Sequence, residues 1–497
     1  MKNSKFKIVT AAFSFCILHF AFCIWAIAQE TPPEPSAPKS VKIPAVVEKK
    51  LPNGLTVAVV QKTSSPIVTI QLLVKCGASC EDESKAGLAD ITASMLTKGT
   101  KTRTATQIAE QIEFLGGSIS SGASWNSSFV SVTVTSDKVA QAMAILSDVV
   151  LNPKFDQKEL DLLKSQTLDG LTYNLKQPSF LANYVASKYS FGEHPAGGTP
   201  ISVQSITASD VSSFHKEEYF PSNSVLVFTG DISATQANLL STKAFSKWEA
   251  RRTVIMGTGD LPSGFVAKPF TSASGKSAAV SRFLVIDLPK SGQASVTYAK
   301  PSWGIGRTTH LYYSATVLNT VLGGGYSSRL NYEIRIKRGL SYGAGSSFGW
   351  RGGKTNFATR VQTKNESAAQ VAELTLDELK RLTNSNVAKD ELIPRKSVLT
   401  GGFGRNLETT GGLANALGDL YAFGIPTGEL NKYVGNVNAV TDAQIKDFAS
   451  QNLLGGDIII VGDYSIFKDD LAKRFPNMKV EVIKADDLDL SKDNLRK

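Results

Sequence analysis

The side chains that could hold a catalytic metal are few in this chain of 497 residues. Beyond residue 28 its histidines are His194, His215 and His310, and no two of them lie within one helical turn of each other. A catalytic zinc site on a helix needs two imidazoles about one turn apart, and a carboxylate that acts as general base for the metal-bound water. The spacing therefore predicts that these histidines form no such site.

Cys76 and Cys80 enclose the segment Gly-Ala-Ser and are the cysteines that remain beyond residue 28. In an exported protein, a close pair of this kind can form a disulfide across a turn. A zinc half-site is the alternative, but no second cysteine pair completes a four-ligand set. We therefore expect a small structural disulfide or two free thiols, and no cofactor held by this chain.

Arg335 and Tyr342 lie seven residues apart and are a second pair with chemical potential. A guanidinium can donate hydrogen bonds to a peptide carbonyl, and a phenol hydroxyl can donate to an oxyanion. The alternative is a surface salt bridge for Arg335 and packing within a sheet for Tyr342. Spacing alone favours this alternative.

The run Gly323-Gly324-Gly325 suggests a phosphate-binding loop, but no Lys-Ser or Lys-Thr pair follows at the required position. We expect instead a tight turn at the entry to a helix, where glycine lets a substrate or partner backbone approach closely. Ser327 or Ser328 is then expected to cap that helix.

Length and composition are those of a folded protein with more than one domain. Hydrophobic residues make up 42% of the chain and charged residues 20%, which is too apolar for a disordered protein. A chain of 497 residues also exceeds what one core usually contains. The formal net charge is +10, but lysine and arginine are scattered, so we expect a solvated basic surface and no nucleic-acid partner.

The first 28 residues have the pattern of a secretory signal. Lys2, Lys5 and Lys7 precede an apolar run over residues 8–27, and Ala26-Ile27-Ala28 provides a small-x-small cleavage site. We expect cleavage there, a periplasmic location and no membrane span in the mature chain. The alternative is an uncleaved signal that anchors the protein, because the apolar run is long enough to cross a bilayer.

A proline-rich leader is expected over residues 29–42, followed by mixed strands and helices. Alternating β-branched residues predict strands, and apolar residues at helical spacing predict helices. In the first half we expect strands at 55–61, 67–75, 118–123 and 128–135, and helices at 86–96, 104–115, 137–151 and 156–175. Because strands and helices do not alternate strictly, the pattern predicts an α+β fold.

A repeated pattern divides the chain into two halves. Residues 205–231 and 439–463 each contain a threonine that can cap a helix, then the helix, then an apolar strand that ends in Gly-Asp. Two such copies imply two similarly folded lobes, which we expect at residues 43–256 and 278–497. The Gly-, Ser- and Pro-rich residues 257–277 are the expected linker.

Four segments together resemble the family of pitrilysin, insulysin and the mitochondrial processing peptidases. The resemblance covers nearly all of the chain beyond the leader. It implies two homologous lobes, each a mixed or antiparallel sheet with helices, that form a clamshell around a peptide. The segments that carry it are residues 51–55, 87–100, 322–330 and 335–342.

The resemblance places Asp90, Ala93 and Ser94 where the family has the first His, the Glu and the second His of its H-x-x-E-H zinc motif. Asp90 can offer one oxygen, but Ser94 is a poor zinc ligand and Ala93 cannot act as a base. The family's third ligand, a Glu, should fall near Asp169 or Gly170, where this chain has no Glu. The resemblance therefore implies a degenerate motif without zinc.

The resemblance also favours a functional role for Arg335 and Tyr342. They match an Arg/Tyr pair that reaches the substrate in the zinc site of active relatives. The strand expected at 128–135 similarly matches an edge strand that pairs with the peptide backbone. A sheet strand buried on one face is the alternative for this segment.

Some members of the family divide the work between a chain with H-x-x-E-H and a chain that lacks it but keeps the Arg/Tyr pair. We therefore expect a non-catalytic subunit of a periplasmic heterodimeric zinc metallopeptidase, which binds peptide and supplies Arg335 and Tyr342 to the active site of a homologous H-x-x-E-H partner. Zinc is expected in that partner. A stand-alone peptide-binding or scaffold protein without proteolytic activity is the alternative. A structural subunit of a membrane complex is a third hypothesis, which the signal disfavours.

Overall fold

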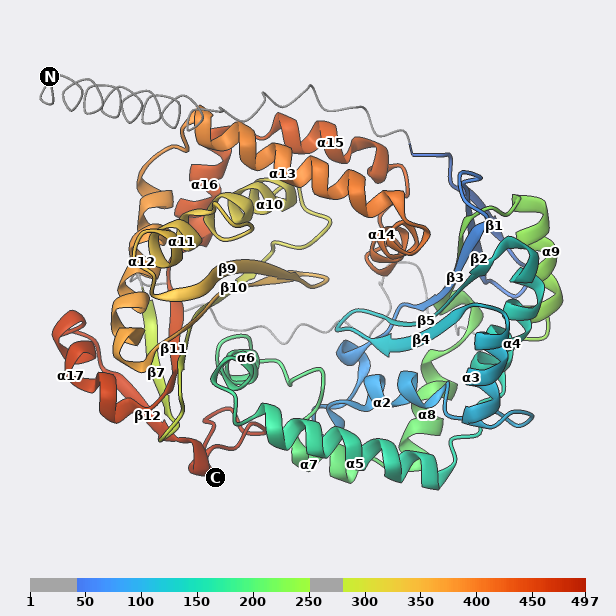
Figure 1. The fold of residues 1–497 in the computed structure, drawn as a ribbon, viewed down its shortest axis with the longest axis horizontal. Helices are drawn as coiled ribbons and strands as arrows, with labels where there is room; N and C mark the ends of the chain where they lie inside the picture. The colour runs from blue at the N-terminus through green and yellow to red at the C-terminus, as the bar shows by residue number, and fades with distance from the viewer. Residues whose placement is uncertain (1–42, 251–279) are drawn as a thin grey trace, which may run out of the picture. The chain divides into compact units, whose positions relative to one another are not determined.

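The computed structural model describes residues 43–250 and 280–497 (Figure 1). The predicted signal peptide, leader and linker (residues 1–28, 29–42 and 257–277) lie outside these described residues. The described residues belong to a single compact unit. Within the described part, no helix is both long enough and apolar enough to cross a membrane.

The first half of the chain is built on a six-stranded sheet of order β1-β2-β6-β3-β5-β4 (Figure 1). β2 and β6 run parallel, and the other neighbours run antiparallel. The strands are β1 (Val47–Lys50), β2 (Thr56–Gln61), β3 (Ile67–Val74), β4 (Ser118–Ala123), β5 (Ser128–Thr135) and β6 (Ser224–Gly230). The helices are α2 (Leu88–Met95), α3 (Ala105–Phe114), α4 (Val139–Leu151), α5 (Gln157–Asn174), α6 (Pro178–Tyr189), α7 (Pro200–Ser205), α8 (Ala208–Glu218) and α9 (Ala234–Phe245).

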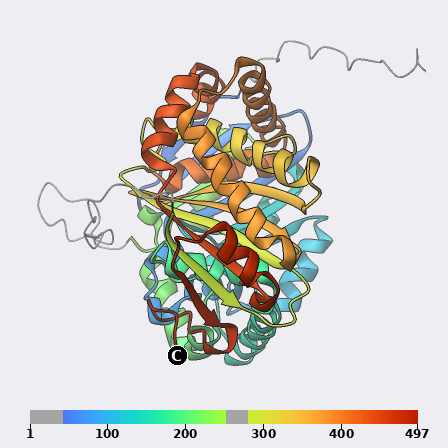
Figure 2. The same ribbon diagram turned by 90° about the vertical axis from the view of Figure 1, so that its left-hand side faces the viewer.

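The second half is built on another six-stranded sheet, of order β12-β7-β11-β8-β10-β9. Figure 2 views this half, with its orange and red helices lying over the strands. The strands are β7 (Val280–Asp287), β8 (Ala294–Trp303), β9 (Ser341–Trp350), β10 (Lys354–Thr363), β11 (Gly456–Gly462) and β12 (Val480–Lys484). The helices are α10 (Tyr312–Leu322), α11 (Arg329–Asn331), α12 (Ala368–Asn384), α13 (Lys389–Glu408), α14 (Thr410–Ala422), α15 (Glu429–Ala439), α16 (Asp442–Asn452) and α17 (Tyr464–Arg474).

The repeat seen in the sequence is a real structural repeat, and the predicted α+β fold with two lobes is confirmed. Thr207 and Thr441 each close a capping box, at the start of α8 and of α16. Each helix leads to a strand whose residues are all buried, β6 or β11, in the middle of its sheet. The glycines that end these strands leave room for neighbours: a Cβ on Gly230 would lie 2.0 Å from a backbone oxygen, and one on Gly462 would lie 2.6 Å from Asn365.

Each half also lends a helix to the other. α6, from the first half, packs its apolar residues Leu181, Val185 and Ala186 against the second sheet. α14, from the second half, packs Leu413 and Leu417 against the first sheet. These two clusters therefore join the two halves through buried apolar contacts.

β5, residues 128–135, pairs with β3 on one side and β4 on the other, so it is not an edge strand. Its alternate residues are buried, which confirms the alternative of a sheet strand buried on one face, and the edge belongs to β4. Two other expectations about local structure are corrected. The glycine run does not open a helix but ends α10, and a Cβ on Gly323 would lie only 2.3 Å from the backbone nitrogen of Ser346 in β9. That glycine makes room for the protein's own sheet. Ser328 precedes α11, but its hydroxyl bonds back to the carbonyl of Gly325 and does not cap the helix.

Candidate functional site

The helix at the expected zinc motif, α2, is held at its N-terminus by a carboxylate and by a glycine. Gly87 precedes the helix with a φ of 93°, and a Cβ there would lie 3.1 Å from Gly198, so glycine fits best. The buried carboxylate of Glu81 accepts hydrogen bonds from the backbone nitrogens of Gly87 (2.8 Å) and Ala89 (2.7 Å). These bonds satisfy two of the amides that every helix start leaves free.

His194 holds the same carboxylate from the other side. Its Nε2 lies 3.0 Å from Oε1 of Glu81 and 3.1 Å from the carbonyl oxygen of Ala78. Because both neighbours are acceptors, Nε2 must carry the proton. Neither Glu81 nor His194 was among the predicted site residues, since 113 positions of sequence separate them and no local pattern joins them.

The three motif positions differ in their access to solvent. Asp90 is exposed, and its Oδ1 accepts a hydrogen bond of 3.3 Å from the backbone nitrogen of Ala123 at the end of β4. The atoms that surround Asp90 remove part of its hydration, which raises the pKa of its carboxyl group. Ser94 is half-buried, and Ala93 is fully buried.

These positions do not fit a zinc ion. One carboxylate and one hydroxyl lack the two imidazoles that a zinc peptidase needs, and a methyl group replaces the base. Asp169 and Gly170 lie on α5, which packs against α2, but neither is the Glu that the third position requires. Among the described His, Cys, Asp and Glu side chains, only Cys76, Cys80 and Glu218 come close enough to share a metal. The two cysteines are instead joined in a disulfide.

Two tyrosines near Asp90 are held in their neutral form. Burial, together with the negative charge of Asp90, raises the pKa of Tyr184 to about 12. Tyr219 is almost completely buried, and its pKa is raised for the same two reasons. Both phenols therefore stay protonated at neutral pH and cannot act as bases.

A buried ion cluster joins the first half to the turn between β9 and β10. Glu193, whose side chain is 5% exposed, lies 3.0 Å from Arg351, 2.8 Å from Lys354 and 2.8 Å from the side-chain nitrogen of Asn356. Burial alone would raise the pKa of Glu193, but the two cations more than offset it and hold that pKa below its usual range. The guanidinium of Arg351 also lies over the ring of Trp125, at 4.7 Å. The cluster therefore ties the two halves together close to His194.

Arg335 and Tyr342 lie on the second half, on neighbouring segments. Arg335 belongs to η5 (Tyr332–Ile336), a π-helical turn, and Tyr342 stands near the start of β9 with 89% of its surface exposed. The guanidinium of Arg335 lies 4.9 Å from the ring centroid of Tyr326. Within the described residues, neither side chain forms an ion pair or a hydrogen bond. Both polar groups are therefore open to a ligand.

The structure does not join these two sets of predicted residues. Within residues 43–250 and 280–497, no hydrogen bond or ion pair links Asp90, Ala93 or Ser94 to Arg335 or Tyr342. The degenerate motif belongs to the first half and the Arg/Tyr pair to the second half.

β4 leaves one edge of the first sheet unpaired among the described strands. Its residues Ser118–Ala123 are mostly small, and none of them is fully buried. Such an edge presents backbone donors and acceptors to which an extended peptide can add as a further strand. The end of this strand is the place where Ala123 bonds to Asp90.

Comparison with known proteins gives a consistent result. The family model described as insulinase, peptidase family M16, matches residues 56–187, and the one described as the peptidase M16 inactive domain matches residues 205–397. An uncharacterized zinc protease of Streptomyces coelicolor is 25% identical over 74% of this chain and 78% of its own length. An uncharacterized zinc protease of Mycobacterium leprae is 25% identical over 84% of this chain and 91% of its own length.

Two solved structures share the fold. The peptidase M16 inactive domain from Pseudomonas fluorescens has a TM-score of 0.73 and 24% identity, and the match covers 84% of this chain and 98% of that one. A protease from Helicobacter pylori has a TM-score of 0.74 and 18% identity, with 84% of this chain and 100% of that chain covered. At these identities the likeness concerns the fold alone.

Proposed function

Because this chain belongs to the M16, or insulinase, family of peptidases and its motif positions do not fit zinc, we propose that it is the non-catalytic subunit of a heterodimeric zinc metallopeptidase. One observation carries the proposal. The residues on α2 cannot hold or activate a metal-bound water, while Arg335 and Tyr342 present free polar groups on the other half. A homologous partner with an intact H-x-x-E-H motif would hold the zinc and supply the base.

Arg335 and Tyr342 would act on a peptide held by that partner. The guanidinium can donate to a peptide carbonyl, and the exposed phenol can donate to the oxyanion of the tetrahedral intermediate. Stacking on Tyr326 limits the freedom of Arg335 while leaving its N–H groups available. The π-helical turn supports this assignment, because such turns are frequent at functional sites.

The free edge of β4 would hold the peptide backbone. An extended peptide that adds to this edge gains main-chain hydrogen bonds whatever its sequence, and the small side chains of the strand leave room for it. This chain would then bind substrate without cutting it.

Reconstitution tests the proposal. The chain is purified alone and together with an H-x-x-E-H homologue. The mixture is then prepared again with the Arg335→Ala or the Tyr342→Phe variant of this chain. Zinc content and peptide turnover are measured for each sample. We expect the chain alone to be inert and free of zinc, and the mixture to cut faster than the homologue alone. Each variant should lower turnover in the mixture about 10²-fold or more, the usual cost of one oxyanion donor.

Arg338→Ala is the matched control. Arg338 lies three residues beyond Arg335 but pairs with Glu333, so its loss should leave turnover unchanged. If Arg335→Ala and Tyr342→Phe also leave turnover unchanged, the donation to a partner's active site is wrong. Stoichiometric zinc with cleavage by the chain alone would overturn the non-catalytic assignment itself.

Export to the periplasm is part of the proposal and rests on the sequence of residues 1–28. A membrane anchor formed by the uncleaved signal is the alternative. The mass of the N-terminal peptide of the purified protein separates the two, because cleavage leaves Gln29 as the first residue.

A stand-alone peptide-binding or scaffold protein is the second candidate function. The free edge of β4 favours it, since an edge of this kind binds extended peptides without any enzymatic partner. Peptide binding by the chain alone, with no gain in turnover on adding any H-x-x-E-H homologue, would favour this function over the first.

A further inference from the structure

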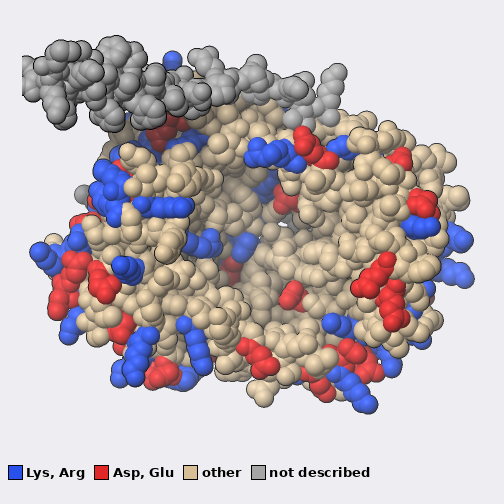
Figure 3. Space-filling view, in the orientation of Figure 1, with Lys and Arg blue, Asp and Glu red and all other residues tan. Residues whose placement is uncertain are grey.

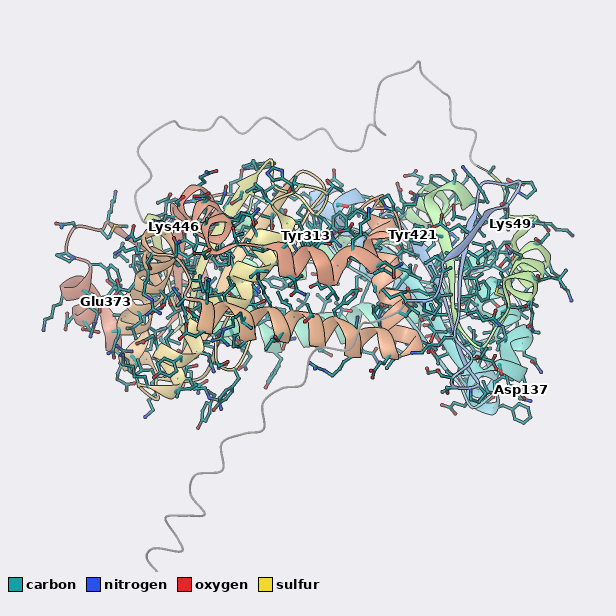
Figure 4. All side chains as sticks on the ribbon, turned by 90° about the horizontal axis from the view of Figure 1, so that it is seen from above. Lys49, Asp137, Tyr313, Glu373, Tyr421 and Lys446 are labelled. Carbon is teal, nitrogen blue, oxygen red and sulfur yellow. A yellow bond between two sulfur atoms is a disulfide. The ribbon has the colours of Figure 1, made fainter. Side chains whose placement is uncertain are left out.

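A second site, apart from the motif helix and from the Arg/Tyr pair, lies within the second half. It is a cavity of about 700 Å³ bounded by the loop between β8 and α10 on one side and by α15 and the turns around it on the other. This volume is typical of sites for small molecules, which span about 300–1,000 Å³. Tyr313, which lines the cavity, is labelled in Figure 4 beside the long helices of this half.

The cavity contains a buried arginine that has an ion-pair partner but incomplete hydrogen bonding. Arg307 is 7% exposed, and its guanidinium lies 3.7 Å from the ring centroid of Tyr312. The nearest carboxylate oxygen, on Asp419, is 3.5 Å from Nε, and within the described residues Nε has no hydrogen-bond partner. Because a guanidinium offers five N–H donors, this side chain can still donate hydrogen bonds to a ligand that enters the cavity.

The backbone of the loop that carries Arg307 is held by glycine turns and hydrogen bonds. Gly304 has a φ of 74°, and a Cβ on Gly306 would lie 2.6 Å from the carbonyl oxygen of Gly352, so the turn requires glycine at these positions. The backbone nitrogen and the hydroxyl of Thr309 both donate to the carbonyl of Gly306. These contacts fix the backbone of the loop, and the ring of Tyr312 and the carboxylate of Asp419 restrict the guanidinium, so less entropy is lost on binding.

The other charges around the cavity limit the class of ligand. Burial raises the pKa of Asp419, against the opposing effect of Arg307. Glu429 accepts hydrogen bonds from the phenol of Tyr313 and from Asn436. Two carboxylates beside one guanidinium disfavour a phosphate dianion more strongly than a single carboxylate, and they can accept hydrogen bonds from an ammonium or an amide N–H group on the same ligand.

We propose that this cavity binds a small molecule with an α-carboxylate, which is either a free amino acid or the C-terminal end of a short peptide. The carboxylate accepts hydrogen bonds from the fork of Arg307, and the nitrogen next to it faces Glu429 and Asp419. The planar guanidinium matches a carboxylate in two parallel bonds. This site is separate from the proposed subunit role and does not depend on it.

Calorimetric titration of the full chain tests the site with four probes: alanine, N-acetyl-alanyl-alanine, the C-terminal amide of that dipeptide, and inorganic phosphate. We expect saturable binding of at least one free-acid probe. The better-binding free acid is the reference. The amide should bind at least about tenfold more weakly because it lacks the charged acceptor of a charge-assisted hydrogen bond. Phosphate should also bind at least about tenfold more weakly because the neighbouring carboxylates oppose its second charge. Alanine alone binding indicates an amino-acid site, and the acetylated dipeptide binding indicates a site for peptide C-termini.

Arg307→Gln should weaken the binding of the free-acid probe at least about tenfold. Arg474→Gln, at a half-exposed ion pair of α17 outside the cavity, is the matched control and should leave binding unchanged. Should Arg307→Gln fail to fold, Asn436→Leu, which closes the cavity from α15, serves in its place and should also abolish binding. The proposal is wrong if acid and amide bind with equal affinity or if phosphate binds most tightly. It is also wrong if either cavity variant binds as well as the natural chain, or if no probe shows saturable binding.

Discussion

Replacing Glu193 by Gln keeps the shape of the side chain but should strongly lower the free energy of unfolding. Glu193 is 5% exposed and faces Arg351 and Lys354, whose side chains are 20% and 12% exposed. The amide of Gln fills the same volume but carries no charge, so both cations would be left buried without a counter-ion. Removing one partner of a buried ion pair costs about 3–5 kcal/mol, and the partial exposure of the cations sets our expectation at about 3 kcal/mol.

The pH dependence gives this prediction a second, independent readout. The cations hold the pKa of Glu193 below its usual range, so its stabilising effect is full above the pKa of an unfolded Glu, about 4.3, and is lost as pH falls through the folded value. The difference between the natural chain and Glu193→Gln should therefore be about 3 kcal/mol at neutral pH and should shrink steadily once the pH falls below about 4.

Urea unfolding followed by tryptophan fluorescence measures both effects, and Trp125 lies against Arg351 as a local reporter. Glu373→Gln is the matched control. Glu373, labelled in Figure 4, forms a half-exposed ion pair with Arg474, and its replacement should lower the free energy of unfolding by less than about 1 kcal/mol. A loss below about 1 kcal/mol for Glu193→Gln, or a loss that does not change with pH, would refute the reasoning that this cluster ties the two halves together.

Three further predictions concern the framework. Gly323→Ala should lower the free energy of unfolding by about 1–3 kcal/mol, because the new Cβ would lie 2.3 Å from a backbone atom. Gly325→Ala is the control and should be tolerated, because no atom lies within 4 Å of its Cβ position. Thermal unfolding compares the two variants. Leu417→Ala leaves a cavity at a fully buried position of α14 against the first sheet, so it should lower the free energy of unfolding by about 2–5 kcal/mol. Leu162 is exposed, so Leu162→Ala should change this free energy very little. Urea unfolding measures both. Burial lowers the pKa of His215 to about 4, so its ring should titrate near pH 4 when followed by NMR. The unfolded chain binds this proton more readily, so the free energy of unfolding should fall as the pH drops from about 6.5 toward 4. A titration midpoint near 6.5 would contradict the burial.

Local patterns in the sequence predicted local structure well. The strands expected at 118–123 and 128–135 are present with the same bounds, and the helix expected at 104–115 begins after a Thr104 capping box. Period-two alternation and capping residues act over a few positions, so they can be recognised without knowledge of the rest of the chain. The scattered charges expected from the sequence are also visible in Figure 3, where both signs are interspersed over most of the face shown.

Long-range pairing was outside the reach of the sequence. Nothing near Glu193 indicates that its partners lie about 160 positions away, on a turn of the other half. The exchange of α6 and α14 between the sheets was missed for the same reason, because an amphipathic helix does not specify which sheet it covers. The sequence also left open whether residues 128–135 form an edge strand or a strand buried on one face, and the second alternative is the one observed. β4 is polar and β5 alternates strongly, so β5 was the easier strand to recognise although β4 is the one at the edge.

The structure around α2 explains how this helix can lose its metal ligands and keep its place. A zinc ion stabilises a site when it holds together segments that would otherwise separate. Here Glu81 binds the first amides of the helix, His194 holds Glu81, and the glycine at the N-terminus fits against Gly198. None of these contacts needs a metal. None of them involves Asp90, Ala93 or Ser94 either, so the start of α2 keeps its place whatever residues stand at the motif positions. The proposed subunit role requires this property, because α2 can then lie beside the edge of β4, where we propose that peptide binds, without any metal.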